Sequence, residues 1–171
     1  MEIFTPFTAE KIKQLKCGDT VFLSGKIFTA RDAAHERMAK ALQNNEAPPF
    51  DYDGQAVFYA GPCPAPPGKP IGSIGPTTAG RMDAYAPAFI AAGLRVMIGK
   101  GDRTPQVIDA IKKHGGLYLV AVGGVAALMA KCVTHSKIIA YDDLGTEAVR
   151  ELTIERLPLV VAIDRLGNAG V

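Results

Sequence analysis

The sequence predicts an α/β fold with a mainly parallel central sheet. Short apolar runs alternate with amphipathic helical patterns through the second half of the chain. The run at 117–122 is apolar throughout, which is typical of a strand buried on both faces. A length of 171 residues, of which 48% are apolar, is enough to bury one sizeable core. We therefore expect residues 1–171 to form a single domain.

In the first half of the chain, two strands and a helix are expected before a proline-rich loop. The apolar residues at 21–24 predict a short strand that ends at Gly25. The segment 29–44 carries apolar residues along one side and is predicted to be a helix, and 56–60 is predicted to be a strand. Residues 62–70 contain five prolines, which cannot supply the amide donors of a helix or a sheet ladder. We expect this segment to be a rigid surface loop.

The second half is predicted to be a regular alternation of strands and helices. An apolar run at 71–74 predicts a strand that leads through a turn into a helix ending near Ala92, because Gly93 can stop it. Thr104 and Pro105 have the residue types of a helix cap and of a first helical position. The other elements expected are a strand at 94–98, a helix from Thr104 to Gly115, a strand at 117–122, a short helix from Gly123 and Gly124 to about Lys131, and strands at 137–141 and 159–163.

Charge and hydropathy exclude several classes of partner. A net charge of +2 is too small and too dispersed for a nucleic-acid or anionic membrane surface. The sequence has no run of about 18 apolar residues that would cross a membrane, and its N-terminus lacks the pattern of a signal peptide. We expect a cytoplasmic protein that binds neither nucleic acid nor membranes.

The chain has three cysteines, Cys17, Cys63 and Cys132, and no C-x-x-C spacing. An odd number at wide spacing predicts neither a disulfide framework nor a metal site within this chain, so we expect reduced thiols. A rigid loop could expose Cys63, which stands between two prolines, but burial as a small hydrophobe is the favoured expectation for a free cysteine.

The segment 75–83 reads Gly-Pro-Thr-Thr-Ala-Gly-Arg-Met-Asp and has the residue types of an anion-binding corner. Pro76 fixes a turn, and either Thr77 or Thr78 can cap the helix that follows. The amides of a first helical turn are then free to meet an anion. Arg81 lies four residues after Thr77, so helical spacing would place both side chains on one face. This pattern favours a site for a carboxylate or a phosphate.

Two further cationic segments accompany this corner. Lys100 and Arg103 follow the strand predicted at 94–98, and Arg31 and His35 open the helix predicted at 29–44. Taken alone, Arg31 and His35 are explained by a solvated helix start. An ordinary surface turn explains Lys100 and Arg103 as well as a binding site does.

The order and spacing of the three segments resemble the beta subunit of the class I fumarase and L-tartrate dehydratase family. The resemblance implies a three-layer swivelling β/β/α domain with a mainly parallel central sheet. In that family the domain is either a separate subunit or the C-terminal part of a longer chain, and the length of this chain is similar to the separate-subunit form.

The resemblance also implies roles for residues of the three segments. Thr77 would be the base that exchanges a proton on the substrate carbon, with Arg81 stabilising its deprotonated hydroxyl, although the sequence alone leaves Thr78 as a competing choice. The catalytic residues implied are Thr77 and Arg81, the substrate-binding residues are Arg31, Thr77, Arg81 and Lys100, and the possible supporting residues are His35, Thr78, Asp83 and Arg103.

The same resemblance implies a partner and a cofactor. A [4Fe-4S] cluster would be bound by the cysteines of an iron-sulfur alpha subunit, and this chain would bind no metal and be inactive alone. The substrate would be a C4 dicarboxylate, with reversible hydration of fumarate to malate first and dehydration of L-tartrate second. A non-catalytic anion-binding module is the third reading, although no nucleotide-binding glycine motif is present. The isolated chain could also form a homo-oligomer.

Overall fold

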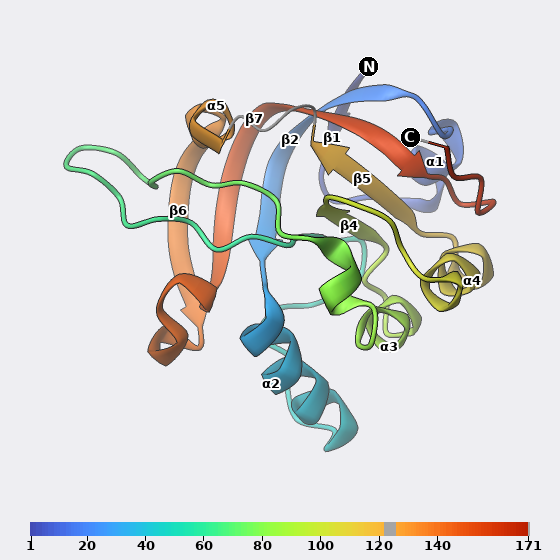
Figure 1. Cartoon of the computed structure of the whole chain (residues 1–171), viewed down its shortest axis with the longest axis horizontal. Helices are drawn as coiled ribbons and strands as arrows, with labels where there is room; N and C mark the ends of the chain where they lie inside the picture. The colour runs from blue at the N-terminus through green and yellow to red at the C-terminus, as the bar shows by residue number, and fades with distance from the viewer. Residues whose placement is uncertain (122–125, 171) are drawn as a thin grey trace.

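The computed structural model of the chain describes residues 1–121 and 126–170, with a seven-stranded sheet at the centre (Figure 1). The strands are β1 (Glu2–Phe4), β2 (Thr20–Thr29), β3 (Ala56–Phe58), β4 (Val96–Gly99), β5 (Leu117–Ala121), β6 (Val133–Ala140) and β7 (Val149–Ile163). The α-helices are α1 (Ala9–Gln14), α2 (Asp32–Gln43), α3 (Ala86–Ala91), α4 (Pro105–His114) and α5 (Ala126–Lys131), and the 3-10 helices are η1 (Ala79–Met82) and η2 (Asp142–Glu147).

The sheet is mostly parallel, so the predicted α/β class is confirmed. Its strand order is β1-β2-β3-β4-β5-β7-β6, and the first five strands in this order pair in parallel. The long strand β7 runs antiparallel to β5 and β6. It also pairs antiparallel with β2, which closes β2, β3, β4, β5 and β7 into a ring. Ring closure leaves no free edge on these strands.

Successive residues of the central strands belong to two different hydrophobic cores. In β4, Val96 and Ile98 contribute to the core shared with β1, α1 and β7, whereas Met97 contributes to the core beneath α2, α3 and α4. Figure 1 shows these three helices on the same side of the sheet. Burial on both faces explains why the strands read as unbroken apolar runs.

Two predicted helices are confirmed with small shifts. Helix α2 begins at Asp32 because Thr29 still belongs to β2, where it pairs with Arg150 of β7. Helix α4 begins after Thr104 and ends at Gly115, whose left-handed conformation (φ 78°) suits a residue without a side chain.

The strand predicted at 71–74 is wrong. Ile71 and Ile74 are buried in the first core, but this segment forms no strand. The Gly72 amide donates to the carbonyl of Cys63, so the chain here folds back on the proline-rich loop. The apolar run therefore reflects burial and not sheet pairing, which the prolines on either side disfavour.

The helix predicted from the 75–83 corner to Ala92 is also interrupted. It consists of the single turn η1 and the short helix α3, which carries Pro87 in its first turn, a position that proline tolerates. Thr77 precedes η1, so the helical spacing expected between Thr77 and Arg81 does not exist. Any proximity of the Thr77 and Arg81 side chains therefore depends on the conformation of the turn between them and not on helical spacing.

The observed bounds of two strands differ from the predicted ones. Strand β2 does not end at Gly25, because a register shift against β7 absorbs the positive φ of this glycine and the strand continues. Strand β7 is much longer than the predicted 159–163, and β1, α1 and η2 were not predicted. The helix start predicted at Gly123 and Gly124 lies outside the described residues. No helix in the described part of the chain is long and apolar enough to cross a bilayer.

Candidate functional site

The turn before η1 and the turn after β4 are joined by backbone hydrogen bonds. Thr78 forms an isolated parallel bridge with Lys100. The Ala79 amide donates to the Lys100 carbonyl at 2.8 Å, and the Lys100 amide donates to the Thr77 carbonyl at 3.3 Å. Two of the three predicted cationic segments therefore lie side by side at the end of β4.

The third segment reaches this corner through an ion pair. Arg81 Nη2 lies 2.6 Å from Asp32 Oδ2, at the first turn of α2. The adjacent Arg31 is the N-cap residue of α2, and its side chain passes Gly61, where a Cβ atom would stand 3.0 Å from Arg31 Cδ. Glycine at position 61 thus leaves room for the arginine. The structure brings the segments of Arg31, Thr77, Arg81 and Lys100 to one corner, and we call these four residues the cationic corner.

Two buried polar atoms at or beside the cationic corner lack hydrogen-bond partners among the described residues. They are Arg31 Nε and Asp32 Oδ1. Buried polar atoms in folded proteins nearly always have partners, so a missing partner marks a place for a water, a ligand or another chain. Arg81 and Lys100 are exposed at the same corner.

The amides of this corner are less available than the sequence predicted. The Thr77 amide donates to the Tyr59 carbonyl at 2.6 Å, and the Ala79 amide is bound to Lys100. Thr78 occupies the N-cap position of η1, but its side chain makes no capping hydrogen bond. Positive charge for an anion therefore comes from side chains and not from these two amides.

Asp83 and Arg103 form a buried ion pair beneath the corner. Arg103 Nε donates to Asp83 Oδ1 at 2.7 Å, and the two side chains are 0% and 5% exposed. The other carboxylate oxygen of Asp83 accepts the Thr104 amide at 2.6 Å. Neither side chain is free to meet a ligand, so both support the corner from below.

Arg103 also contacts two tyrosines. Its Nη2 donates to the Tyr59 hydroxyl oxygen at 3.1 Å, and its guanidinium carbon lies 4.7 Å from the centre of the Tyr118 ring. Burial on its own would lower the pKa of Arg103, but its interactions with Tyr59 and Asp83 outweigh burial and raise it. The guanidinium is therefore a permanent buried charge.

His35 is a core residue and not part of a solvated helix start. It is 1% exposed, its Nδ1–H donates to the Arg31 carbonyl at 2.9 Å, and its ring packs edge-on against Tyr59 and Phe89. Burial lowers the pKa of His35 to about 4, so the imidazole is neutral at pH 7. His35 fixes the backbone of Arg31 and cannot touch a ligand at the surface.

The N-terminus of α2 is occupied by a residue that sequence reasoning missed. Glu147 Oε1 accepts the Ala33 amide at 3.0 Å, across 114 positions of sequence. Two parallel hydrogen bonds of 2.8 Å from Arg37 to Asp143 also attach η2 to this helix. No local sequence signal could have identified Glu147, because its partner is distant in the chain.

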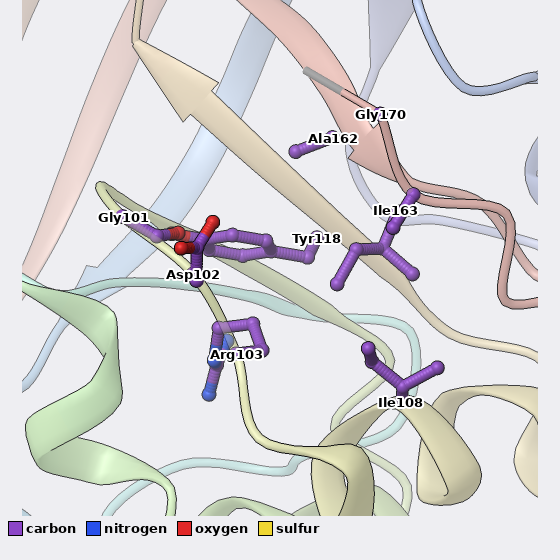
Figure 2. A pocket seen from close by; sticks show the side chains of 9 residues that line it. Gly101, Asp102, Arg103, Ile108, Tyr118, Ala162, Ile163 and Gly170 are labelled. Carbon is purple, nitrogen blue, oxygen red and sulfur yellow. The ribbon is translucent and has the colours of Figure 1, made fainter.

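A separate pocket of about 370 Å³ lies beside the turn that follows β4 (Figure 2). Gly101, Asp102 and Tyr118 form one wall, and Ile108 and Ile163 form the apolar part. No residue of the cationic corner lines it, and its two charged lining residues, Asp102 and Arg103, have opposite signs, so the pocket offers no excess of positive charge for a dianion. The candidate site is therefore the open cationic corner and not this pocket.

The cysteines offer no metal site in the described part of the chain. No three His, Cys, Asp or Glu side chains gather there in a metal-binding group. All three thiols are free, and Cys63 is exposed, so the expectation that it is buried is wrong. An iron-sulfur cluster requires several convergent thiolates, and the described residues of this chain do not fit one.

The chain resembles several curated proteins. It is 40% identical to "Fumarate hydratase 2" of Leishmania major over 161 residues, which cover 93% of this chain and 28% of that protein. It is 38% identical to "Fumarate hydratase class I, aerobic" of Escherichia coli over 160 residues, or 92% of this chain and 29% of that protein. The chain thus spans less than a third of the length of these enzymes.

One relative is similar over most of its own length. The "Putative L(+)-tartrate dehydratase subunit beta" of Methanocaldococcus jannaschii is 38% identical over 176 residues, which cover 97% of this chain and 88% of that protein. The family model described as "Fumarase C-terminus" matches residues 1–170. The resemblance read from the three cationic segments is confirmed, and the chain belongs to the Fumarase C-terminus family.

Proposed function

We propose that this chain is the beta subunit of an iron-sulfur hydro-lyase that reversibly hydrates fumarate to malate. The observation that supports the proposal is that the three segments carrying Arg31, Thr77, Arg81 and Lys100 meet at one corner in a chain of this family. A C4 dicarboxylate carries two negative charges and needs several fixed cations. Arginine can bind a carboxylate through two parallel hydrogen bonds, whereas lysine supplies a compact charge.

The cationic corner can stabilise the charge that develops during the reaction. Negative charge grows on the carboxylate next to the carbon that loses or gains a proton. Cationic donors already fixed around that group lower the barrier, and removing one donor typically costs about 3 kcal/mol of activation free energy. We assign Arg31, Arg81 and Lys100 to this role.

We assign the proton transfer at the substrate carbon to Thr77. Backbone hydrogen bonds hold both its amide, through Tyr59, and its carbonyl, through Lys100. A threonine hydroxyl is a weak base in water, so the neighbouring cations have to stabilise its deprotonated form. Thr78 is the competing residue, since it is exposed and its side chain makes no capping hydrogen bond.

The remainder of the site is proposed to come from an alpha subunit. The cationic corner is open, and the fumarate hydratases similar to this chain are more than three times longer. We infer that the alpha subunit binds the [4Fe-4S] cluster and that this chain is active only in its presence. We also infer a single swivelling β/β/α domain over 1–171, which the ring of strands and the helices on one face support. A cytoplasmic location is a further part of the proposal.

L-tartrate is the second candidate substrate. The relative named as a tartrate dehydratase subunit beta is similar over 88% of its length, which favours this alternative. Fumarate, malate and tartrate share two carboxylates and differ in their hydroxyl groups, so loops of the alpha subunit would contribute to the choice. A non-catalytic anion-binding module is the remaining alternative.

The test is anaerobic co-expression with an alpha subunit, followed by cluster reconstitution and two assays. One measures fumarate formed from malate, and the other measures oxaloacetate formed from tartrate. Thr77→Val should lower kcat by roughly 10²- to 10⁴-fold, and Thr78→Val, the matched control, should lower it much less. Turnover that Thr77→Val leaves unchanged would remove the catalytic assignment, and a wild-type pair inactive on both substrates would favour the binding module.

A further inference from the structure

The cationic corner is assembled from segments that are distant in sequence, so something must hold them in register. Two buried side chains lie directly beneath it, Asp83 from the end of η1 and Arg103 from the turn after β4. Asp83 binds Arg103 with one oxygen and the Thr104 amide with the other. This pair therefore joins the segment of Arg81 to the segment of Lys100.

Tyr59 connects the pair to the other two corner residues. Its hydroxyl accepts a hydrogen bond from Arg103, and its backbone carbonyl accepts the Thr77 amide. Its ring packs against His35, which in turn holds the carbonyl of Arg31. One guanidinium thus has a short path of direct contacts to each corner segment.

We propose that Arg103 is a positioning residue that fixes Lys100 relative to Thr77 and Arg81. The consequence for catalysis rests on the proposed function, whereas the contacts of Arg103 with Asp83 and Tyr59 do not depend on that function. Arg103 lines the pocket beside this turn, but its side chain is 0% exposed and its Nε and Nη2 are already bound, so we assign it no contact with the substrate. It acts by removing freedom from the turn that carries Lys100.

The role requires a guanidinium and not merely a positive charge. Arg103 uses Nε for Asp83, Nη2 for Tyr59 and the face of the group for Tyr118. These directions are fixed in a planar fork, whereas a lysine ammonium is a single point that cannot reach all three. Arg103→Lys therefore keeps the charge and removes the geometry.

Hydrogen exchange followed by NMR on the isolated chain tests this directly. The informative amides are those of Ala79, Lys100 and Thr104, because each closes a hydrogen bond between the two turns. In Arg103→Lys their exchange should rise about tenfold more than that of the Leu119 and Val161 amides in the sheet, because neither residue contacts Arg103 among the described hydrogen bonds. A purely structural role would raise exchange equally at all five positions and would overturn the inference, as would unchanged exchange.

Arg156→Lys is the matched control. Arg156 also combines an ion pair, with Glu2, and a ring contact, with Phe22, but its side chain is exposed. It should leave the turn amides unchanged. Asp83→Asn is the second variant if Arg103→Lys does not fold, since it retains an acceptor for Thr104 and should raise exchange at the same amides by a smaller factor.

A malate titration separates this inference from the proposed function. In the reconstituted pair of subunits, the wild-type chain should bind malate, and Arg103→Lys should bind it about tenfold more weakly, with the Arg156→Lys control unaffected. If the wild type fails to bind malate while Arg103→Lys still frees the turn amides, the proposed function fails and the positioning role stands. If malate binding and exchange are both unchanged in Arg103→Lys, the positioning role fails and the proposed function stands.

Discussion

Two ion pairs at the same corner have nearly equal lengths and opposite surroundings. Arg103 and Asp83 lie 2.7 Å apart with side chains 0% and 5% exposed, whereas Arg81 and Asp32 lie 2.6 Å apart with side chains 56% and 34% exposed. Burial makes the first pair a fixed part of the fold. Exposure leaves Arg81 accessible, as its proposed role in binding a substrate carboxylate requires. Distance alone would have assigned both pairs the same role.

The largest expected difference is in stability. Asp83→Ala leaves a buried guanidinium without its partner and should lower the free energy of unfolding by roughly 3 to 5 kcal/mol. Asp32→Ala breaks an exposed pair and should lower it by at most about 1 kcal/mol. Urea unfolding of both variants measures this, and equal losses would break the comparison.

The next effect is on turnover of the reconstituted pair of subunits. Arg81→Ala should lower kcat by about 10²- to 10³-fold, because the variant lacks the donor that we propose for the developing charge. The free energy of unfolding should change by less than about 1 kcal/mol, since the side chain is exposed. Undiminished turnover, with assembly intact, would mean that Arg81 binds the partner and not the substrate.

The buried side of the corner should also respond to pH through His35. Its pKa of about 4 lies below the usual value of 6.5, so the unfolded chain binds more protons between these two pH values. The stability that neutral His35 contributes is present above about pH 6.5 and is lost as pH falls towards 4, by up to roughly 3 kcal/mol.

Urea unfolding of the wild type and of His35→Gln across pH 4 to 7.5 measures this contribution. The glutamine amide can still donate to the Arg31 carbonyl, but it does not titrate. The difference between the two proteins should therefore depend on pH in the stated direction. Parallel curves for wild type and variant would show that His35 is protonated as readily in the folded chain as in the unfolded one.

The smallest expected effect is that of salt. A double-mutant cycle on Arg81 and Asp32 should give a coupling below about 1 kcal/mol that fades at 1 M salt, because exposed charges are screened. The same cycle on Arg103 and Asp83 should retain most of its coupling. Similar salt dependence of the two cycles would show that burial does not distinguish the pairs.

The sequence predicted local features well and contacts between distant segments poorly. The caps of α4 and the apolar runs of β4 and β5 have local signals, and each was found near its observed bounds. The prediction of a strand at 71–74 was wrong, because burial against a loop and pairing in a sheet select the same residue types.

The cationic corner was predictable only in part. Its residues came from a family resemblance, and their meeting depends on tertiary contacts that leave no periodic pattern. The sequence did not predict roles for Tyr59 and Glu147 at the corner, because their partners Arg103 and Ala33 are distant in sequence. Arg103 is buried and Arg81 is exposed, and this difference cannot be predicted from residue type, since both are arginines.

The position of a bound C4 dicarboxylate in the reconstituted pair of subunits tests the central claim most directly. An anaerobic crystal structure with malate should place a carboxylate within about 3 Å of side-chain nitrogens of Arg31, Arg81 and Lys100, with Arg103 still bound to Asp83. Malate bound elsewhere, with these three cations in contact only with the partner polypeptide, would contradict the account.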